Sequence, residues 1–163
     1  MNTEVELYLK KCNLAPVVYE HPAVFSVDEA EIHCKHVKGM HCKNLFLKEK
    51  ECVVPRYFLV VMDAFKRLNI NQLAKLLGVK KLTFGSPDEL FSYLGLTPGS
   101  VSPLGLINNT NHEVVVIVDH DVWDAASVNF HPNINTASLE FTREQFHLLM
   151  ESFANEKKVV KLE

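Results

Sequence analysis

The amino-acid sequence predicts a mixed α/β fold, formed by one domain that spans residues 1–163. A length of 163 residues is enough for one full hydrophobic core. About seven strand-like segments and five helical segments alternate irregularly, which favours a mixed sheet over a strictly alternating parallel one. The apolar run "VVVIV" at 114–118 indicates the strongest strand of the chain, buried on both faces.

Two capping boxes mark the helices in the first third of the chain. In Thr3–Glu6 and in Ser26–Glu29 a hydroxyl residue stands three positions before a glutamate, a pattern typical of helix N-termini. Gly39 is expected to mark the end of the second helix. Two runs rich in β-branched and aromatic residues follow, joined by a turn. The expected elements are a helix at 3–11, a strand within 15–21, a helix at 26–36, and strands at 44–49 and 56–63.

In the rest of the chain, glycine and proline mark helix ends and loops. Gly78 and Gly95 stop two short helices, and the second of these begins with a Ser86 cap followed by proline. The segment "LTPGSVSPLGL" at 96–106 holds too much glycine, proline and serine for a regular element and predicts a structured loop. Thr142 opens a C-terminal helix with one apolar face. The expected elements are helices at 71–77, 86–95 and from 142, and strands at 81–84, 113–119, in two pieces within 126–141, and at 158–162.

The composition indicates a soluble globular protein, with 47% apolar and 23% charged residues. A net charge of −3 argues against broad, nonspecific binding of nucleic acid. No apolar run approaches the ~20 residues that span a bilayer, and the N-terminus lacks the pattern of a signal peptide. We therefore expect a cytoplasmic protein with no membrane association, whose four cysteines are reduced thiols.

Histidines and cysteines gather between residues 33 and 42, which raises the hypothesis of a metal site. Their side chains are of the types that zinc accepts. The spacing contains no C-x-x-C or H-x-x-x-H pair, and His41 and Cys42 are neighbours on a predicted strand, so they point to opposite faces. We expect no metal and no other cofactor. The residues concerned are His33, Cys34, His36, His41 and Cys42.

Nucleophilic catalysis is a second hypothesis. Cys42 beside Lys43 could be activated by a distant base such as His131, although buried inert cysteine is the common case. Ser100 and Ser102 lie in "PGSVSP", but neither has the G-x-S-x-G context of a nucleophile elbow.

A ligand pocket built without a nucleophile is the third hypothesis. Lys43 opens a predicted buried strand, where an ammonium needs a partner or an anionic ligand, and Asn44 adds a donor and an acceptor. Gly99-Ser100 could turn backbone N–H groups toward an anion, or could form an ordinary turn. His131 is either a structural histidine or part of a pocket wall.

Six motifs in collinear order resemble one family over nearly the whole chain. The combination of G-x-H-x-K-N, P-G-S-V-[ST]-P and F-H-P-x-x-N-T-A is specific, although each piece alone is weak. The chain resembles the YbaK-type editing domains, also found inserted in bacterial prolyl-tRNA synthetases, and within them the free-standing PrdX or ProXp-ala branch. The motifs are Tyr19–Ala30, Gly39–Lys50, Tyr57–Met62, Leu82–Leu90, Leu94–Asn108 and Asn129–Phe141.

This resemblance implies a trans-editing hydrolase that deacylates mischarged Ala-tRNA-Pro, with water attacking the ester and no covalent intermediate. It implies a curved, barrel-like mixed sheet, and as partners the acceptor end of tRNA-Pro and a prolyl-tRNA synthetase. Cys-tRNA-Pro or another small aminoacyl-tRNA as the substrate, or a non-catalytic binding module, remain alternatives. The implied catalytic residues are Lys43, Asn44, Gly99, Ser100 and His131. The expected substrate-binding residues are Val24, Phe25, His41, Asn135 and Thr136 at the pocket, and Lys80 and Lys81 toward the acceptor stem.

Overall fold

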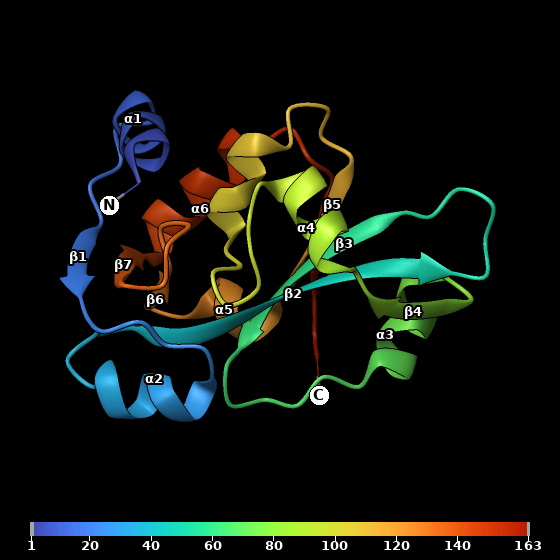
Figure 1. Cartoon of the computed structure of the whole chain (residues 1–163), viewed down its shortest axis with the longest axis horizontal. Coiled ribbons are helices and arrows are strands. Elements are labelled where there is room, and N and C mark those ends of the chain that lie inside the picture. Colours follow the sequence, from blue (N-terminus) through green and yellow to red (C-terminus); the bar gives the residue numbers. More distant parts are fainter. Residues whose placement is uncertain (1, 163) are drawn as a thin grey trace.

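Eight strands form one mixed sheet in the computed structural model, which describes residues 2–162 (Figure 1). The strand order is β1-β7-β6-β2-β3-β5-β8, and β4 pairs with β2 beside this path. The mixed α/β class predicted from the sequence is confirmed. Within the described residues the path of paired strands does not close on itself. The strands are β1 (Val17–Glu20), β2 (Met40–Lys50), β3 (Tyr57–Asp63), β4 (Lys81–Phe84), β5 (Val114–Asp119), β6 (Ser127–Phe130), β7 (Ala137–Thr142) and β8 (Lys157–Val160).

Strand β2 is the longest and connects the two halves of the sheet, crossing the molecule in Figure 1. One edge of β2 pairs antiparallel with β3 over Cys42–Lys48. The other edge pairs in parallel with β6 at Met40–His41 and antiparallel with β4 at Leu47–Lys50. Residues 42–46 on this second edge therefore face no paired strand among the described residues. We refer to this interval as the β2 gap.

Helices cover both faces of the sheet. Helix α3 packs on one face, whereas α1, α4, the 3₁₀ helix η1 and α6 pack on the other. No helix within residues 2–162 combines the length and the apolar character needed to cross a membrane. The helices are α1 (Thr3–Lys11), α2 (Val27–His33), α3 (Ile70–Leu77), α4 (Pro87–Leu94), η1 (Pro103–Asn108), α5 (His120–Asp124) and α6 (Arg143–Ser152).

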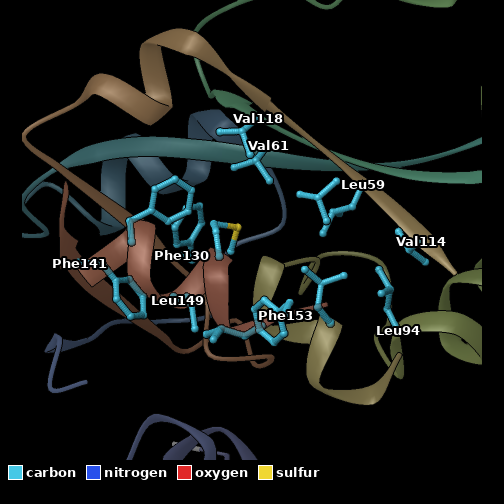
Figure 2. Close-up of a cluster of buried hydrophobic side chains, with 14 of the residues drawn as sticks. Leu59, Val61, Leu94, Val114, Val118, Phe130, Phe141, Leu149 and Phe153 are labelled. Atoms are coloured by element: carbon cyan, nitrogen blue, oxygen red, sulfur yellow. The ribbon is translucent and has the colours of Figure 1, made fainter. Parts of the chain in front are cut away.

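Strand β5 is buried along its whole length, as the apolar run predicted. Successive side chains of a strand alternate between faces, so Val114, Val116 and Val118 join the larger core with the aromatic side chains of α6 and β7. Figure 2 shows side chains of this cluster, among them Val114 and Val118 of β5, Phe141 of β7 and Leu149 of α6. The intervening valine and isoleucine of β5 join the second core under α3.

The helices differ from the sequence expectations at four places. Helix α1 is capped by Asn2, whose side chain accepts from the N–H groups of the first turn, rather than by the Thr3 capping box. Asparagine is at least as good an N-cap as threonine. Helix α2 ends at His33, short of the expected residue 36. The loop at 96–106 contains the start of η1, because Ser102 caps it and Pro103 fits its first position. Helix α5 was not predicted.

Candidate active site

A pocket of about 460 Å³ lies beside the β2 gap. Its walls come from the segment around α2, the first half of β2, the loop after β3, the loop before η1, and the β6–β7 region. This size is ordinary for a small-molecule site. The lining residues are Val24, Phe25, Ser26, Ala30, Glu31, Cys34, Lys35, His41, Cys42, Lys43, Asn44, Ala64, Phe65, Gly99, Val101, Asn129, Phe130, His131 and Ser138.

Lys43 lies on β2 at the pocket, and a backbone carbonyl orients its amine. Nζ of Lys43 donates a hydrogen bond to the carbonyl oxygen of Lys66. Burial lowers the pKa of Lys43, and the nearby Asp63 carboxylate opposes this effect. An ammonium has three N–H donors, and this one has a single acceptor among the described residues. It can therefore also donate to an oxygen atom of a ligand.

The loop that carries this carbonyl is itself anchored. Nζ of Lys66 donates to Oδ2 of the fully buried Asp119 and to the carbonyl oxygen of Leu162, each at 2.9 Å. It also contacts Oδ2 of Asp121 at 2.6 Å. Burial alone would lower the pKa of Lys66, but the hydrogen bonds to Asp121 and Asp119 outweigh burial and raise it. The position of the Lys43 amine therefore depends on an ion pair on the far side of the loop.

Asn44 offers an acceptor without a partner in the described protein. Its Nδ2 donates to the carbonyl oxygen of Val101 at 3.2 Å, which fixes the orientation of the amide. The Oδ1 atom is buried and accepts no hydrogen bond from the described residues. Because buried polar atoms are nearly always paired in native structures, this oxygen is a candidate to receive a ligand donor.

Gly99 forms a tight turn at the pocket wall. Its φ of +92° lies in the region that favours glycine. A Cβ at this position would stand 2.9 Å from Cδ1 of Phe25. The N–H of Ser100 donates to the carbonyl oxygen of Thr97 at 3.1 Å. With Pro98 as the second residue and Gly99 as the third, this is the pattern of a type II turn.

The turn changes which N–H groups can serve a ligand. Ser100 is buried and is not among the lining residues, and its N–H is used within the turn. The N–H groups of Gly99 and Val101 donate no hydrogen bond to any residue that the structure describes. Both residues line the pocket, so the candidate anion donors lie on either side of Ser100.

Three histidines approach one another around the pocket. Nδ1 of His131 donates to the carbonyl oxygen of Ala137 at 2.9 Å, which leaves Nε2 as an acceptor in the neutral ring. Burial lowers the pKa of His131, and the neighbouring His21 and His41 lower it further. The rings of His21 and His131 are 5.8 Å apart, and Nε2 of His21 lies 2.8 Å from Oγ of Ser138. Burial also lowers the pKa of His41.

We expect the protein to lose stability as the pH falls from 7 to 5. A histidine whose pKa is lowered on folding binds its proton less readily in the folded state. Its stabilising effect is full above the unfolded pKa of about 6.5 and declines as the pH falls below it. Urea unfolding at several pH values should show this decline, and His131→Gln should make it shallower. The control is His33→Gln, because His33 is exposed. If the free energy of unfolding falls equally steeply with pH in wild type and in His131→Gln, the prediction is wrong.

The remaining expected substrate-binding residues take different places. Val24 is buried and lines the pocket, and Nδ2 of Asn135 donates to its carbonyl oxygen at 3.3 Å. Asn135 thus supports the wall without being among the lining residues. Thr136 is exposed outside the pocket, and its carbonyl oxygen accepts from the N–H of His21. The sequence placed Thr136 at the wall because of its motif, whereas the backbone conformation turns its side chain to solvent.

Lys80 and Lys81 lie away from the pocket. Both are exposed, and their amines approach the Glu51 carboxylate at 3.9 and 3.1 Å. Lys81 pairs with Lys50 in the sheet, seven residues along β2 from Lys43. At ~3.3 Å per residue the two sites are separated by ~23 Å along the strand.

Cys42 packs against the larger core, and its Sγ donates to the carbonyl oxygen of Met40. Burial, together with the Asp63 and Asp119 carboxylates, raises the pKa of this thiol. A raised pKa disfavours the thiolate that a nucleophile requires. Within residues 2–162, no three His, Cys, Asp or Glu side chains come together as a metal-binding group.

Replacement of Cys42 by serine is expected to retain catalytic activity. Because the raised pKa of the thiol disfavours the thiolate, kcat/KM should change by less than about threefold. The measurements are the steady-state hydrolysis of the mischarged aminoacyl-tRNA that the resemblance implies and a thermal unfolding curve of the variant. A hundredfold kinetic loss in a variant of native stability would revive the thiol hypothesis.

Sequence reasoning assigned no site role to several residues that the fold brings to this region. Asn129 donates from Nδ2 to the carbonyl oxygens of Lys38 and Gly39 and thereby fixes the entry to β2. His21 was quoted within a motif, but nothing in its neighbourhood indicated contact with His131. Phe65 follows β3 without any local pattern that would single it out.

Comparison with known proteins gives a consistent result. The profile of the aminoacyl-tRNA editing domain family matches residues 21–147. Prolyl-tRNA editing protein ProX of Acetoanaerobium sticklandii is 33% identical over 144 residues, which are 88% of this chain and 86% of the relative. Prolyl-tRNA synthetase associated domain-containing protein 1 of Danio rerio is 32% identical over 144 residues, covering 87% and 77% of the two chains.

Solved structures share the fold at lower sequence identity. A crystal structure of a hypothetical protein superposes with a TM-score of 0.75 at 24% identity, covering 98% of each chain. A structure described as a candidate trans-editing enzyme for prolyl tRNA synthetase superposes with a TM-score of 0.73 at 18% identity, covering 100% of this chain and 98% of the other. Because the family profile spans most of the chain and two relatives exceed 30% identity over most of their length, this protein belongs to the aminoacyl-tRNA editing domain family.

Proposed function

We propose that this protein hydrolyses mischarged Ala-tRNA-Pro in trans, releasing alanine and a tRNA with a free 3′ end. One observation carries the proposal: a single pocket joins Lys43, Asn44, Gly99 and His131 from segments far apart in the sequence. The similarity to a protein named for prolyl-tRNA editing supports the same substrate class. The pocket volume of about 460 Å³ suits an aminoacyl group with part of its nucleoside.

The proposed reaction needs no nucleophilic side chain, because an aminoacyl ester is already activated. A water molecule attacks the ester carbonyl and forms a tetrahedral oxyanion. The bond from the carbonyl carbon to the ribose oxygen then breaks, and the proton released by the water passes to that oxygen. The protein has to hold the ester, stabilise the oxyanion and keep the water near the carbonyl.

Lys43 and Asn44 hold the two ends of the aminoacyl ester in this mechanism. The Lys43 amine, held by the Lys66 carbonyl, binds an oxygen of the ester or of the terminal phosphate. The unpartnered Oδ1 of Asn44 accepts from the α-ammonium of the aminoacyl group, a charge-assisted hydrogen bond.

The developing oxyanion is placed at the turn around Gly99. The N–H groups of Gly99 and Val101 have no acceptor in the described protein, so they are the donors we assign to this role in place of the Ser100 N–H. One donor of this kind is worth ~10²–10³ in rate.

His131 is assigned to the terminal ribose. Its neutral ring, with the proton on Nδ1, presents Nε2 as an acceptor for a ribose hydroxyl. That hydroxyl can in turn orient the attacking water. His41 lies in the same pocket and lines the path to this hydroxyl.

Selectivity is proposed to come from exclusion by size. Val24, Ala30 and Cys34 line the pocket near α2, and two of them belong to a small apolar cluster separate from the main cores. A pocket that fits alanine rejects proline by overlap. Exclusion discriminates better than a preference for a smaller ligand, which yields only ~1–3 kcal/mol per methylene.

We assign binding of the acceptor-stem duplex to Lys80 and Lys81. These exposed amines, ~23 Å along β2 from Lys43, contact backbone phosphates in the proposed complex and exchange their Glu51 contacts for them. A prolyl-tRNA synthetase is the proposed protein partner.

The deciding experiment is a deacylation assay with tRNA-Pro charged with alanine, cysteine or proline, with and without a chelator. We expect hydrolysis of the alanyl ester, no hydrolysis of the prolyl ester, and no effect of the chelator. Survival of Ala-tRNA-Pro at stoichiometric enzyme would refute the proposal. Faster hydrolysis of the cysteinyl ester would reassign the substrate within the same chemistry.

A further inference from the structure

Two phenylalanine rings line the pocket and yet remain open to solvent. Phe25 is 69% exposed and Phe65 is 62% exposed, although both are lining residues. Neither ring packs against another aromatic ring of the described residues. Phe25 precedes α2, whereas Phe65 lies in the loop after β3, so two separate segments each bring one ring to the rim.

The backbone at both positions is held by specific contacts. The N–H of Phe25 donates to Oε2 of Glu29 at 3.0 Å, and the ring lies against Gly99, where a Cβ would stand only 2.9 Å from it. The N–H of Phe65 donates to Oδ1 of Asp63 at 2.9 Å. The next residue is Lys66, whose amine is tied to Asp119. The backbone that carries each ring is therefore anchored beside the pocket.

Under the proposed function, the leaving part of the substrate passes these two rings. If the aminoacyl ester occupies the floor at Lys43 and Asn44, the nucleoside that carries it extends toward the rim. Its base has flat apolar faces, which aromatic side chains bind by stacking. Hydrogen-bond readout of a base needs matched polar groups, whereas these two rings provide none.

We propose that Phe25 and Phe65 form a stacking site for the terminal base of a 3′-aminoacylated RNA. This inference rests on the proposed function, because it takes the orientation of the substrate from it. Each ring is expected to contribute about 5- to 150-fold in affinity, the range for stacking of one base on an aromatic side chain. Stacking holds any base that fits, so the rings contribute affinity, and the selection of the amino acid is left to the pocket interior.

Binding of a short RNA tests this site separately from catalysis. The probe is the trinucleotide CCA, compared with the same trinucleotide that lacks its 3′-terminal base, and both are titrated by NMR. Wild type should bind CCA at least about fivefold more tightly than the abasic probe. Phe25→Leu and Phe65→Leu should each reduce this difference, and Phe65→Trp should retain it. The control is Phe91→Leu, since Phe91 is 64% exposed on α4 and does not line the pocket.

The outcomes separate the two proposals. If wild type prefers CCA and the leucine variants lose that preference, the stacking site is supported, even if Ala-tRNA-Pro is not hydrolysed. If wild type hydrolyses Ala-tRNA-Pro but both leucine variants keep the full preference for CCA, the stacking site is wrong and the proposed function stands. Equal binding of CCA and the abasic probe by wild type also overturns the stacking site.

Discussion

Replacement of Lys43 by alanine is expected to lower kcat/KM for Ala-tRNA-Pro hydrolysis by about 10²–10³-fold. The side chain lies at the pocket, and its amine makes one hydrogen bond to the described protein, to the Lys66 carbonyl. Its removal therefore eliminates a cation at the proposed position of the ester while leaving both hydrophobic cores unchanged. We expect the circular dichroism spectrum and the unfolding midpoint to stay close to those of wild type.

Lys35→Ala is the matched control for this variant. Lys35 also lines the pocket, but it is exposed and no hydrogen bond orients its amine among the described residues. Its loss should affect activity by less than tenfold, a difference of about 1.4 kcal/mol in the barrier. If Lys43→Ala deacylates Ala-tRNA-Pro as fast as wild type, Lys43 has no part in the mechanism.

Replacement of Lys66 by methionine is expected to destabilise the fold by about 3 kcal/mol and to reduce activity as well. Asp119 is fully buried, and removing its cation leaves a buried carboxylate without its charge partner. Breaking such pairs costs ~3–5 kcal/mol, and we take the lower end because the Lys66 side chain keeps 25% of its surface exposed. The loop that positions Lys43 loses its anchor at the same time.

Urea unfolding measures the first effect, and steady-state kinetics at a permissive temperature measures the second. The double variant Lys66→Met/Asp119→Asn should be less destabilised than the sum of the two single variants, because the pair is then removed together. Arg67→Met is the control, because Arg67 is the next residue in the sequence and its side chain is exposed. A Lys66→Met protein as stable as wild type would contradict the role given to this ion pair.

The fold could be predicted well wherever local signals govern structure. The unbroken valines of β5, the caps at Ser86 and Thr142, and the glycine at the end of α3 all act within a few residues, and the structure confirms each of them. The exchange of Thr3 for Asn2 as the cap of α1 shows the limit of such signals, because two adjacent residues compete for the same role.

The candidate site was predictable only in part. Lys43, Asn44, Gly99 and His131 reach one pocket, as the order of motifs implied, although their catalytic roles stay predictions. The chemistry of single residues favoured Lys43 and Asn44 over a metal or thiol site at His41 and Cys42, but left all three hypotheses open. The sequence did not reveal that the Ser100 N–H is already hydrogen-bonded within the loop, because this depends on the turn type that Pro98 and Gly99 adopt together.

Contacts between distant residues were beyond sequence reasoning. Lys66 and Asp119 are 53 positions apart, and no periodicity or motif connects them. The same holds for His21 and His131, whose rings meet because β1 and β6 both pair with β7. Such pairings follow from the three-dimensional packing of the sheet, which a single sequence does not specify.

The β2 gap separates two kinds of selective pressure within a single strand. Leu47, beyond the gap, is fully buried in a core, so mutation there threatens folding itself. Asn44 lies in the gap and lines the pocket, and no strand among the described residues pairs with its outer edge. Substitution at such a gap position can therefore reshape the pocket while the strand pairing on either side of the gap stays intact.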